Sequence, residues 1–193
     1  MTQPLPDFAA ARRAMIDSQL RPQGVTDSAV LSAMARVPRE EFVPESTRSI
    51  AYGDRPLDLG NGAALMPPAA LGRLLTELQP RPGERALVVG SGNGYSAAVL
   101  RALGLAVDTT AGLADLGKGT FDIVLFDGAV EDMPDDVAAR MAPGGRLGTA
   151  VSDNGVTRLA IGKVAGGALG LRQFADSDVP LLPGFARPRA FTF

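Results

Sequence analysis

Hydrophobic residues recur at helical spacing in three segments of the N-terminal part of the chain. The pattern predicts helices over 8–20, 28–36 and 68–78, with apolar positions three and four residues apart in each. Proline and glycine are frequent between the second and third of these segments. We therefore expect 43–68 to form a long ordered loop with little regular structure.

From residue 80 onward the pattern changes to short apolar runs separated by turns and helices. Short continuous apolar runs are typical of parallel strands that are buried on both faces. Helices are expected over 96–103 and 134–141. Strands are expected over 85–89, 105–108, 121–126, 146–151, 159–164 and 170–175, the last two as an antiparallel pair at the sheet edge.

This order of elements predicts an α/β fold with a Rossmann-like sheet and an N-terminal helical segment. A length of 193 residues suits one compact domain. Within it, we expect a helical and loop segment (1–79) to pack on a Rossmann-like core (80–193).

Two missing residue types exclude several kinds of chemistry. The chain contains no cysteine and no histidine. Without cysteine there is no disulfide, thiol nucleophile or zinc–thiolate site, and without histidine the usual general base and the commonest metal ligand are missing. We therefore expect no metal site, and any reaction must proceed without an imidazole.

The charge pattern gives no reason to expect a nucleic acid or a membrane as a partner. The net charge is −2, the arginines are scattered, and aromatic residues make up 5% of the chain. No apolar stretch approaches the roughly 20 residues of a membrane span, and the beginning of the chain does not resemble a signal peptide. A cytoplasmic location is therefore expected.

The strongest candidate for a binding site is the glycine-rich turn after the predicted strand 85–89. Its residues are Gly90, Ser91, Gly92, Asn93, Gly94 and Tyr95. Glycines there let the backbone approach a ligand beyond the carboxyl ends of parallel strands. The spacing G-x-G-x-G differs from the G-x-G-x-x-G of dinucleotide-binding proteins and suits the methionine and ribose parts of S-adenosylmethionine. Alternatively, the turn is a tight connection that binds nothing.

Two acidic residues are candidates for the same site. Asp127-Gly128 follows strand 121–126 on the same rim of the sheet, where a carboxylate can bind a cofactor amine or the adenine edge. Asp108 ends the short strand 105–108 and can accept hydrogen bonds from ribose hydroxyls. Asp127 is equally well explained as a helix cap or solvated acid, and Asp108 as a turn residue. The nearby acids are interpreted as first-turn helix acids: Glu131, Asp132, Asp135 and Asp136.

Short motifs spread over nearly the whole chain point to one family. In the N-terminal part they are Met15-Ile-x-x-Gln19-Leu20, Gly24-Val25-x-Asp27, Val30-Leu31-x-Ala33-Met34, Val37-Pro38-Arg39-Glu40-x-Phe42-Val43-Pro44 and Ala51-Tyr52-x-Asp54-x-Pro56-Leu57. Later motifs are Leu87-x-Val89-Gly90-Ser-Gly92-x-Gly94-Tyr95, Phe121-Asp122-Ile123, Pro143-Gly144-Gly145-Arg146-Leu147 and Val179-Pro180-Leu181. Together they resemble the protein-L-isoaspartate O-methyltransferases, and the string V-P-R-E-x-F-V-P is the most specific of them.

The resemblance implies S-adenosylmethionine as cofactor and the α-carboxylate of an isoaspartyl or D-aspartyl residue in a protein as methyl acceptor. A sulfonium methyl group is already electrophilic, and a carboxylate is already ionised at neutral pH. Such a reaction needs no general base, so no catalytic residue is assigned. Catalysis would come from holding oxygen and methyl in line and from desolvating them.

The loop after Pro56-Leu57 departs from the family pattern. The family carries Gly-Gln-Thr-Ile-Ser, whose serine and polar neighbours contact the substrate, whereas this chain carries Gly62-Ala-Ala-Leu-Met66. An acceptor carboxylate would depend on backbone N–H groups and Asn61, and a missing partner for a charged group costs about 1.5–3 kcal/mol. We expect Asn61, Gly62 and Met66 to line the acceptor site.

Two further departures concern the cofactor. Val88 stands where the family has an acid in its glycine motif. The stretch between Gly90 and Phe121 is also short, where the family has a further helix, a strand and an acidic ribose site. The expected ribose acid falls near 109–111, which leaves Asp108 as a substitute.

The leading interpretation is therefore a methyltransferase that resembles this family. A non-catalytic relative that acts as a binding or scaffold protein is the alternative that the departures favour. A nicotinamide-dependent oxidoreductase disagrees with the glycine spacing. The sequence leaves the oligomeric state open, a homodimer included.

Overall fold

The N-terminal part of the chain forms a group of short helices. The computed structural model describes residues 7–60, 62–90, 94–112 and 119–187. Helix α1 (Phe8–Met15) continues into a π-helical turn, η1 (Ile16–Leu20), and α2 (Ser28–Arg36) follows. The carboxylate of Asp27 caps α2 by accepting hydrogen bonds from the N–H groups of Ala29 and Val30. The helices predicted over 8–20 and 28–36 are thus confirmed.

The segment predicted as a loop contains more regular structure than expected. It holds two 3₁₀ helices, η2 (Arg39–Phe42) and η3 (Glu45–Ile50), and an antiparallel hairpin of β1 (Leu57–Gly60) and β2 (Ala63–Leu65). The expectation of little regular structure over 43–68 is therefore wrong. These elements are short, and the hairpin is held by its pairing and by packing of Leu57 and Leu65 in the core. Helix α3 (Pro68–Leu78) begins and ends as predicted.

A six-stranded sheet forms the centre of the molecule, with the strand order β4-β3-β5-β6-β7-β8. Strands β3 (Arg85–Val89), β4 (Ala106–Thr110), β5 (Phe121–Val130) and β6 (Met141–Asp153) are parallel. Strands β7 (Val156–Ala165) and β8 (Ala168–Asp176) form the predicted antiparallel pair at one edge. Helix α4 (Tyr95–Ala102) connects β3 to β4, which is the opposite edge strand. The Rossmann-like α/β prediction is confirmed.

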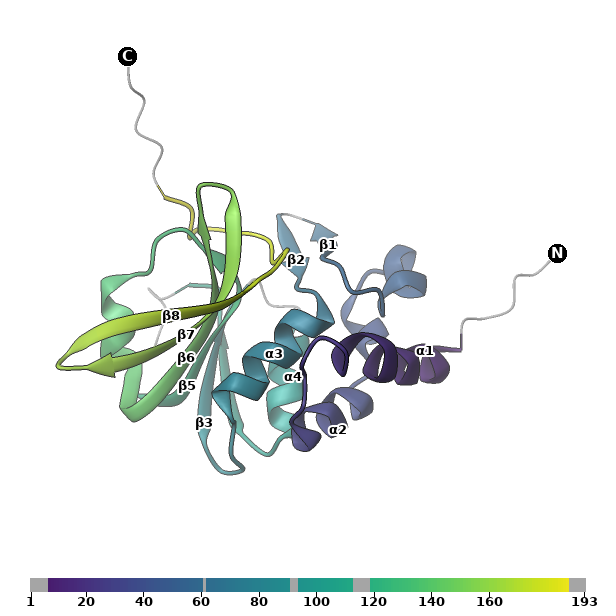
Figure 1. The fold of residues 1–193 in the computed structure, drawn as a ribbon, viewed down its shortest axis with the longest axis horizontal. Coiled ribbons are helices and arrows are strands. Elements are labelled where there is room, and N and C mark those ends of the chain that lie inside the picture. Colours follow the sequence, from purple (N-terminus) through teal and green to yellow (C-terminus); the bar gives the residue numbers. More distant parts are fainter. Residues whose placement is uncertain (1–6, 61, 91–93, 113–118, 188–193) are drawn as a thin grey trace, which may run out of the picture.

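The two faces of the sheet are covered unequally. Helices α1 to α4 lie together on one face (Figure 1), where most of the buried apolar side chains form a single core. The other face is covered by the 3₁₀ helix η5 (Asp135–Arg140) and by a C-terminal segment, and its apolar cluster is much smaller. The α-helix predicted over 134–141 is wrong: the structure has the 3₁₀ helix η5 after Pro134, and β6 already begins at Met141.

The C-terminal segment, which we call the strap (residues 179–187), runs along the end of β5. The N–H of Ala129 donates to the carbonyl oxygen of Pro180 at 2.8 Å, and the N–H of Leu182 donates to Ala129 at 2.7 Å. The rings of Phe185 and Phe126 meet edge to face, with their centroids 5.3 Å apart. Strand β5 reaches Val130, beyond the predicted end at residue 126, and its last residues, Ala129 and Val130, also pair with β6.

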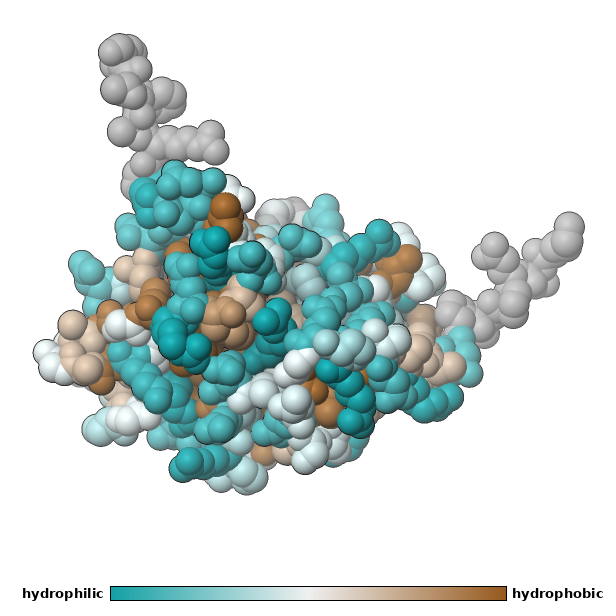
Figure 2. Space-filling model, in the orientation of Figure 1, coloured by the Kyte–Doolittle hydropathy of each residue, from teal (hydrophilic) through white to brown (hydrophobic). Residues whose placement is uncertain are grey.

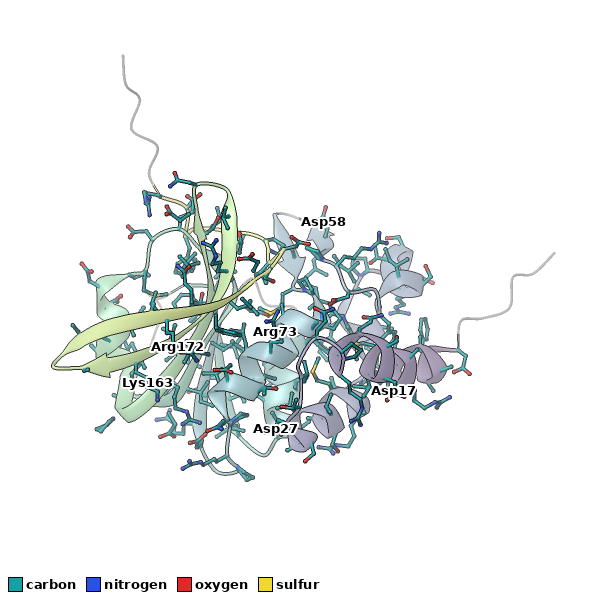
Figure 3. All side chains as sticks on the ribbon, in the orientation of Figure 1. Asp17, Asp27, Asp58, Arg73, Lys163 and Arg172 are labelled. Atoms are coloured by element: carbon teal, nitrogen blue, oxygen red, sulfur yellow. The ribbon has the colours of Figure 1, made fainter. Side chains whose placement is uncertain are left out.

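The surface of the molecule is mostly polar. Figure 2 shows apolar residues scattered between polar ones on the visible face, and the exposed large ones are Ile50, Val156, Val164, Leu171 and Leu181. Charged side chains such as Asp17 and Lys163 project from the outside of their elements (Figure 3). None of the helices in the described ranges combines the length and apolar composition that crossing a membrane requires.

Candidate functional site

The glycine-rich turn lies at the carboxyl rim of the sheet, between β3 and α4. Gly90 directly follows β3, and its N–H donates to the carbonyl oxygen of Thr110 at 2.8 Å, which ties the turn to the end of β4. Gly94 precedes α4 with a φ of 78°, in the left-handed region that favours glycine. Residues 91–93 lie outside the described residues, so their role in binding stays a prediction.

Asp127 lies directly beside Gly90. Val88 of β3 pairs in register with Leu125 of β5, so Asp127, two residues beyond Leu125, lies at the level of Gly90. A Cβ atom added at Gly90 would approach the Cβ of Asp127 to 2.8 Å, which real Cβ atoms do not do. Gly90 therefore makes room for Asp127, and the structure brings these two predicted residues together.

The carboxylate of Asp127 is buried at this rim. Its oxygen accepts a hydrogen bond of 2.7 Å from the hydroxyl of Ser96 in the first turn of α4. Burial raises the pKa of Asp127, whereas the hydrogen bond from Ser96 and the charge of Arg39 lower it. A buried carboxylate is costly unless it is paired, and the same position can bind an ammonium group. Asp127 is thus suited to a cationic ligand group.

Gly128 contacts the strap rather than open space. A Cβ atom there would lie 2.9 Å from the Cβ of Leu182, so glycine lets the strap approach β5 closely. The structure gives Gly128 a packing role, and its predicted contact with a cofactor stays a prediction.

Arg39 was not predicted as a site residue, yet it lies at the centre of this region. It is fully buried, and its guanidinium donates to the carbonyl oxygens of Ala51 at 2.7 Å and Met66 at 2.6 Å. The guanidinium carbon lies 4.8 Å from the centroid of the Tyr95 ring. Burial lowers the pKa of Arg39, whereas Tyr95 and the charge of Asp127 raise it.

Arg39 therefore joins the predicted acceptor loop to the first residue of α4. In the sequence, the string V-P-R-E-x-F-V-P was the only sign that Arg39 is important. That string does not reveal which residues Arg39 contacts in the folded protein. Tyr95 is fully buried as well, with its ring edge to face against Phe42 at 5.5 Å. Its predicted contact with a cofactor stays a prediction, because its position supports a packing role.

The predicted acceptor residues lie on and after the β1–β2 hairpin. Gly62 has a φ of 76°, and a Cβ added there would lie 3.9 Å from the ring of Pro183 in the strap. The side chain of Met66 is buried, so only its carbonyl group, bound to Arg39, faces the site that we describe. Asn61 lies outside the described residues. Asp58 points outward from the hairpin (Figure 3) and accepts a hydrogen bond from the N–H of Gly60.

Asp108 does not lie at the carboxyl rim. Strand β4 continues to Thr110, and Asp108 pairs in register with Leu87 in the middle of β3. Its exposed carboxylate forms an ion pair of 3.3 Å with Arg85, the first residue of β3. The expectation that Asp108 ends its strand is therefore wrong, because the pairing with β3 extends further than the apolar pattern. Nothing in these contacts directs Asp108 toward the glycine turn.

A cavity of about 430 Å³ opens beside the ends of the strands that flank β3. Its lining comes from the loops after β4 and β5 and from the strap: Ala111, Gly112, Asp132, Pro134, Pro183, Gly184, Phe185 and Ala186. Cavities of this size accommodate small-molecule ligands. The rim thus combines a glycine turn, a buried carboxylate and an adjoining cavity.

Comparisons with known proteins relate this arrangement to one family. A model of the protein-L-isoaspartate(D-aspartate) O-methyltransferase family matches residues 10–107. A protein-L-isoaspartate O-methyltransferase of Methylorubrum extorquens is 35% identical over an alignment that covers 95% of this chain and 93% of that protein. One of Koribacter versatilis is 34% identical, with 92% and 93% covered.

Solved structures show the same fold. A Plasmodium falciparum protein described as a putative protein-L-isoaspartate O-methyltransferase, in complex with S-adenosyl-L-homocysteine, matches with a TM-score of 0.73 and 17% identity. That match covers 89% of this chain and 97% of the other. The alignment with the Methylorubrum protein spans 212 positions, more than the 193 residues of this chain. The relative therefore carries segments that this chain lacks.

Proposed function

This chain belongs to the protein-L-isoaspartate(D-aspartate) O-methyltransferase family, and we propose that it is a methyltransferase that uses S-adenosylmethionine. The proposed acceptor is the carboxylate of an isoaspartyl residue in a protein. The observation that carries this proposal is the pairing of Gly90 with the buried carboxylate of Asp127 at the carboxyl rim, beside a cavity of about 430 Å³.

The residues at the rim suit the groups of the cofactor. S-adenosylmethionine has an ammonium group, which the buried carboxylate of Asp127 would bind, and a carboxylate, which backbone N–H groups at the start of α4 would bind. Gly90 and Gly94 leave the backbone accessible because they carry no side chain. We therefore assign the methionine part of the cofactor to the turn 90–95 and Asp127.

The proposed chemistry agrees with the residues that the chain contains. When bound, S-adenosylmethionine supplies an electrophilic methyl group, which an ionised carboxylate can accept without a general base. The absence of histidine therefore does not exclude this reaction. What the protein must do is hold the acceptor carboxylate in line and exclude water from it. Arg39 supports this by fixing the backbone at Ala51 and Met66.

We place the acceptor at the β1–β2 hairpin, next to the strap. The loop here has Ala63 and Ala64 where the family pattern has polar side chains, so backbone groups near Gly62 would bind the carboxylate. A protein methylated in this way at damaged aspartyl residues would be a substrate for repair. Repair, a cytoplasmic location and a homodimer are predictions that rest on the sequence alone.

A non-catalytic relative that acts as a binding or scaffold protein is the second candidate. The observation that favours it is the acceptor loop, in which the Met66 side chain is buried and two alanines replace polar residues. Such a protein would retain the cofactor site but transfer no methyl group to an isoaspartyl peptide.

Two measurements distinguish these candidates. Calorimetric titration with S-adenosylmethionine and S-adenosylhomocysteine tests the cofactor site. Incubation with an isoaspartyl peptide and a radiolabelled methyl donor then tests transfer, with the matched aspartyl peptide as control. Micromolar binding and ester formation on the isoaspartyl peptide alone would support the enzyme. Binding without transfer would favour another acceptor or the scaffold, and no binding at millimolar ligand would overturn the methyltransferase proposal.

A further inference from the structure

Among the described residues that line the cavity beside the rim, one is acidic. It is Asp132, which lies in the loop after β5. It is exposed, and within the described residues no hydrogen bond or ion pair engages it. The other acids near the rim have partners: Glu131 binds Arg187 of the strap, and Asp127 binds Ser96.

The other described residues that line the cavity are apolar residues and glycines. Pro134 on one side and Pro183, Phe185 and Ala186 of the strap on the other supply apolar surface, while two glycines in the lining leave backbone groups accessible. A planar aromatic base packs well against such surfaces. The strap is held in place by backbone hydrogen bonds to β5, including one of 3.0 Å from the N–H of Glu131 to the carbonyl oxygen of Phe185.

The position of Asp132 contrasts with that of Asp108. Asp108 was the only candidate for the ribose, but its carboxylate is paired with Arg85 in the part of β3 remote from the glycine turn. Asp132 lies in the loop after β5, the strand whose Asp127 lies beside Gly90, and it lines a cavity that Ala111 and Gly112, directly after β4, also line. A nucleoside at this rim would therefore reach Asp132 and not Asp108.

We propose that Asp132 is the residue that binds the ribose hydroxyls of the cofactor, with the base held between Pro134 and the strap. The inference rests on the proposed function, since it names residues of the same cofactor site. A carboxylate has two oxygens that accept hydrogen bonds, and the two neighbouring hydroxyls of a ribose can donate to both. The strap thereby forms the wall that a longer connection between β4 and β5 would supply.

This arrangement explains how the chain can bind a nucleoside although its β4–β5 connection is short. Among the strands of the described residues, β4 is the edge of the sheet on that side. The strap comes from the end of the chain and reaches the same rim across β5. The acid that binds the ribose would accordingly lie not on β4, one neighbour of β3, but in the loop after β5, the other neighbour of β3.

The test compares Asp132→Asn with wild type and with Asp135→Asn, a matched exposed acid of η5 that does not line the cavity. Three probes are titrated by calorimetry: S-adenosylhomocysteine, adenosine and 2′,3′-dideoxyadenosine. We expect Asp132→Asn to weaken the first two by roughly 10- to 100-fold, because hydrogen bonds to the charged carboxylate are lost. The dideoxy nucleoside lacks both hydroxyls, so its affinity should be the same for the variant and wild type. Asp135→Asn should bind all three as wild type does.

Two results would overturn the inference. One is equal affinity of Asp132→Asn and wild type for S-adenosylhomocysteine, which would leave the proposed function intact because the wild type still binds. The other is an equal loss for adenosine and the dideoxy nucleoside, which would mean that Asp132 does not act through the ribose. If the wild type binds none of the probes, both the inference and the methyltransferase proposal fail.

Discussion

The two sides of the candidate cofactor site are built in different ways. On the side of Asp127, the site is built from buried side chains: Ser96 donates to Asp127, and Arg39 lies over the ring of Tyr95. On the side of β4, the site is open. It consists of a cavity, an edge strand and a strap from the end of the chain.

The difference follows the boundary of the family match only in part, because Asp127 lies after the match. That match covers residues 10–107 and ends within β4, and the closed side contains Arg39 and Tyr95 from this part of the chain. The open side consists of residues after the match. The matched segment thus supplies Arg39 and Tyr95 on one side, whereas on the other side the proposed adenosine site depends on the strap.

The largest expected effect comes from filling the space at Gly90. In Gly90→Val a Cβ would lie 2.8 Å from the Cβ of Asp127, and the branched side chain adds further overlap. We expect loss of measurable S-adenosylhomocysteine binding by calorimetry and a decrease of about 1–3 kcal/mol in the free energy of unfolding in urea. The matched control is Gly170→Ala, where the nearest atom is 4.0 Å away and little should change. Wild-type affinity in Gly90→Val would show that the turn does not contact the cofactor.

Removing Arg39 should have the next largest effect, on stability and on the acceptor loop. Arg39→Met leaves the buried carbonyl groups of Ala51 and Met66 without their donor, at about 1–3 kcal/mol for each. Part of this loss is offset because a buried charge is also removed. We expect a lower urea midpoint and faster hydrogen exchange over 57–66, with Arg13→Met on the exposed face of α1 as control. An unchanged midpoint would mean that Arg39 does not hold the closed side together.

Asp127 should show a trade-off between stability and binding. Burial raises the pKa of Asp127 in the folded state, so the ionised carboxylate costs stability above that raised pKa. The cost decreases as the pH falls below the raised pKa and is gone below the ordinary pKa of an aspartate, so wild type and Asp127→Asn should become equally stable at low pH. At neutral pH we expect Asp127→Asn to unfold at a higher urea concentration than wild type.

The same variant should bind the cofactor more weakly, by roughly 10- to 100-fold, because an amide cannot neutralise an ammonium group. The affinity of wild type should also fall as the pH falls through the raised pKa of Asp127. Asp136→Asn, an exposed acid of η5, serves as the control. A variant that is less stable and binds normally would make Asp127 a structural residue.

The sequence predicted most of the closed side and little of the open side. Apolar periodicity placed α2, α3, β3 and α4 to within a residue or two, because each has a regular pattern and a clear end signal. The pairing of Gly90 with Asp127 followed from the rule that ligands bind at the carboxyl ends of parallel strands. Arg39 was missed because its role depends on contacts with Ala51 and Met66, which no local pattern encodes.

On the open side, the pattern after β4 is too short and irregular to predict its structure. The strap pairs with β5 across more than 40 residues of sequence, as the hydrogen bond between Ala129 and Pro180 shows. The extension of β5 was missed because Asp127 and Gly128 interrupt its apolar run, whereas Ala129 and Val130 beyond them still pair with β6. Asp132 was interpreted as a first-turn helix acid, but η5 begins only at Asp135, which leaves Asp132 in the loop that lines the cavity.

The smallest effect is expected at Asp108, and a small effect there would distinguish it from Asp132 as the acid that binds the ribose. Its ion pair with Arg85 is exposed, and exposed pairs contribute about 0–1 kcal/mol to stability. Asp108→Asn should therefore change the urea midpoint little, and it should leave the affinity for S-adenosylhomocysteine at the wild-type value. A tenfold loss of affinity in this variant would indicate that Asp108 on β4 binds the ribose and would contradict the role proposed for Asp132. Equal affinity, together with a loss in Asp132→Asn, would establish that the acid has moved from one neighbour of β3 to the other.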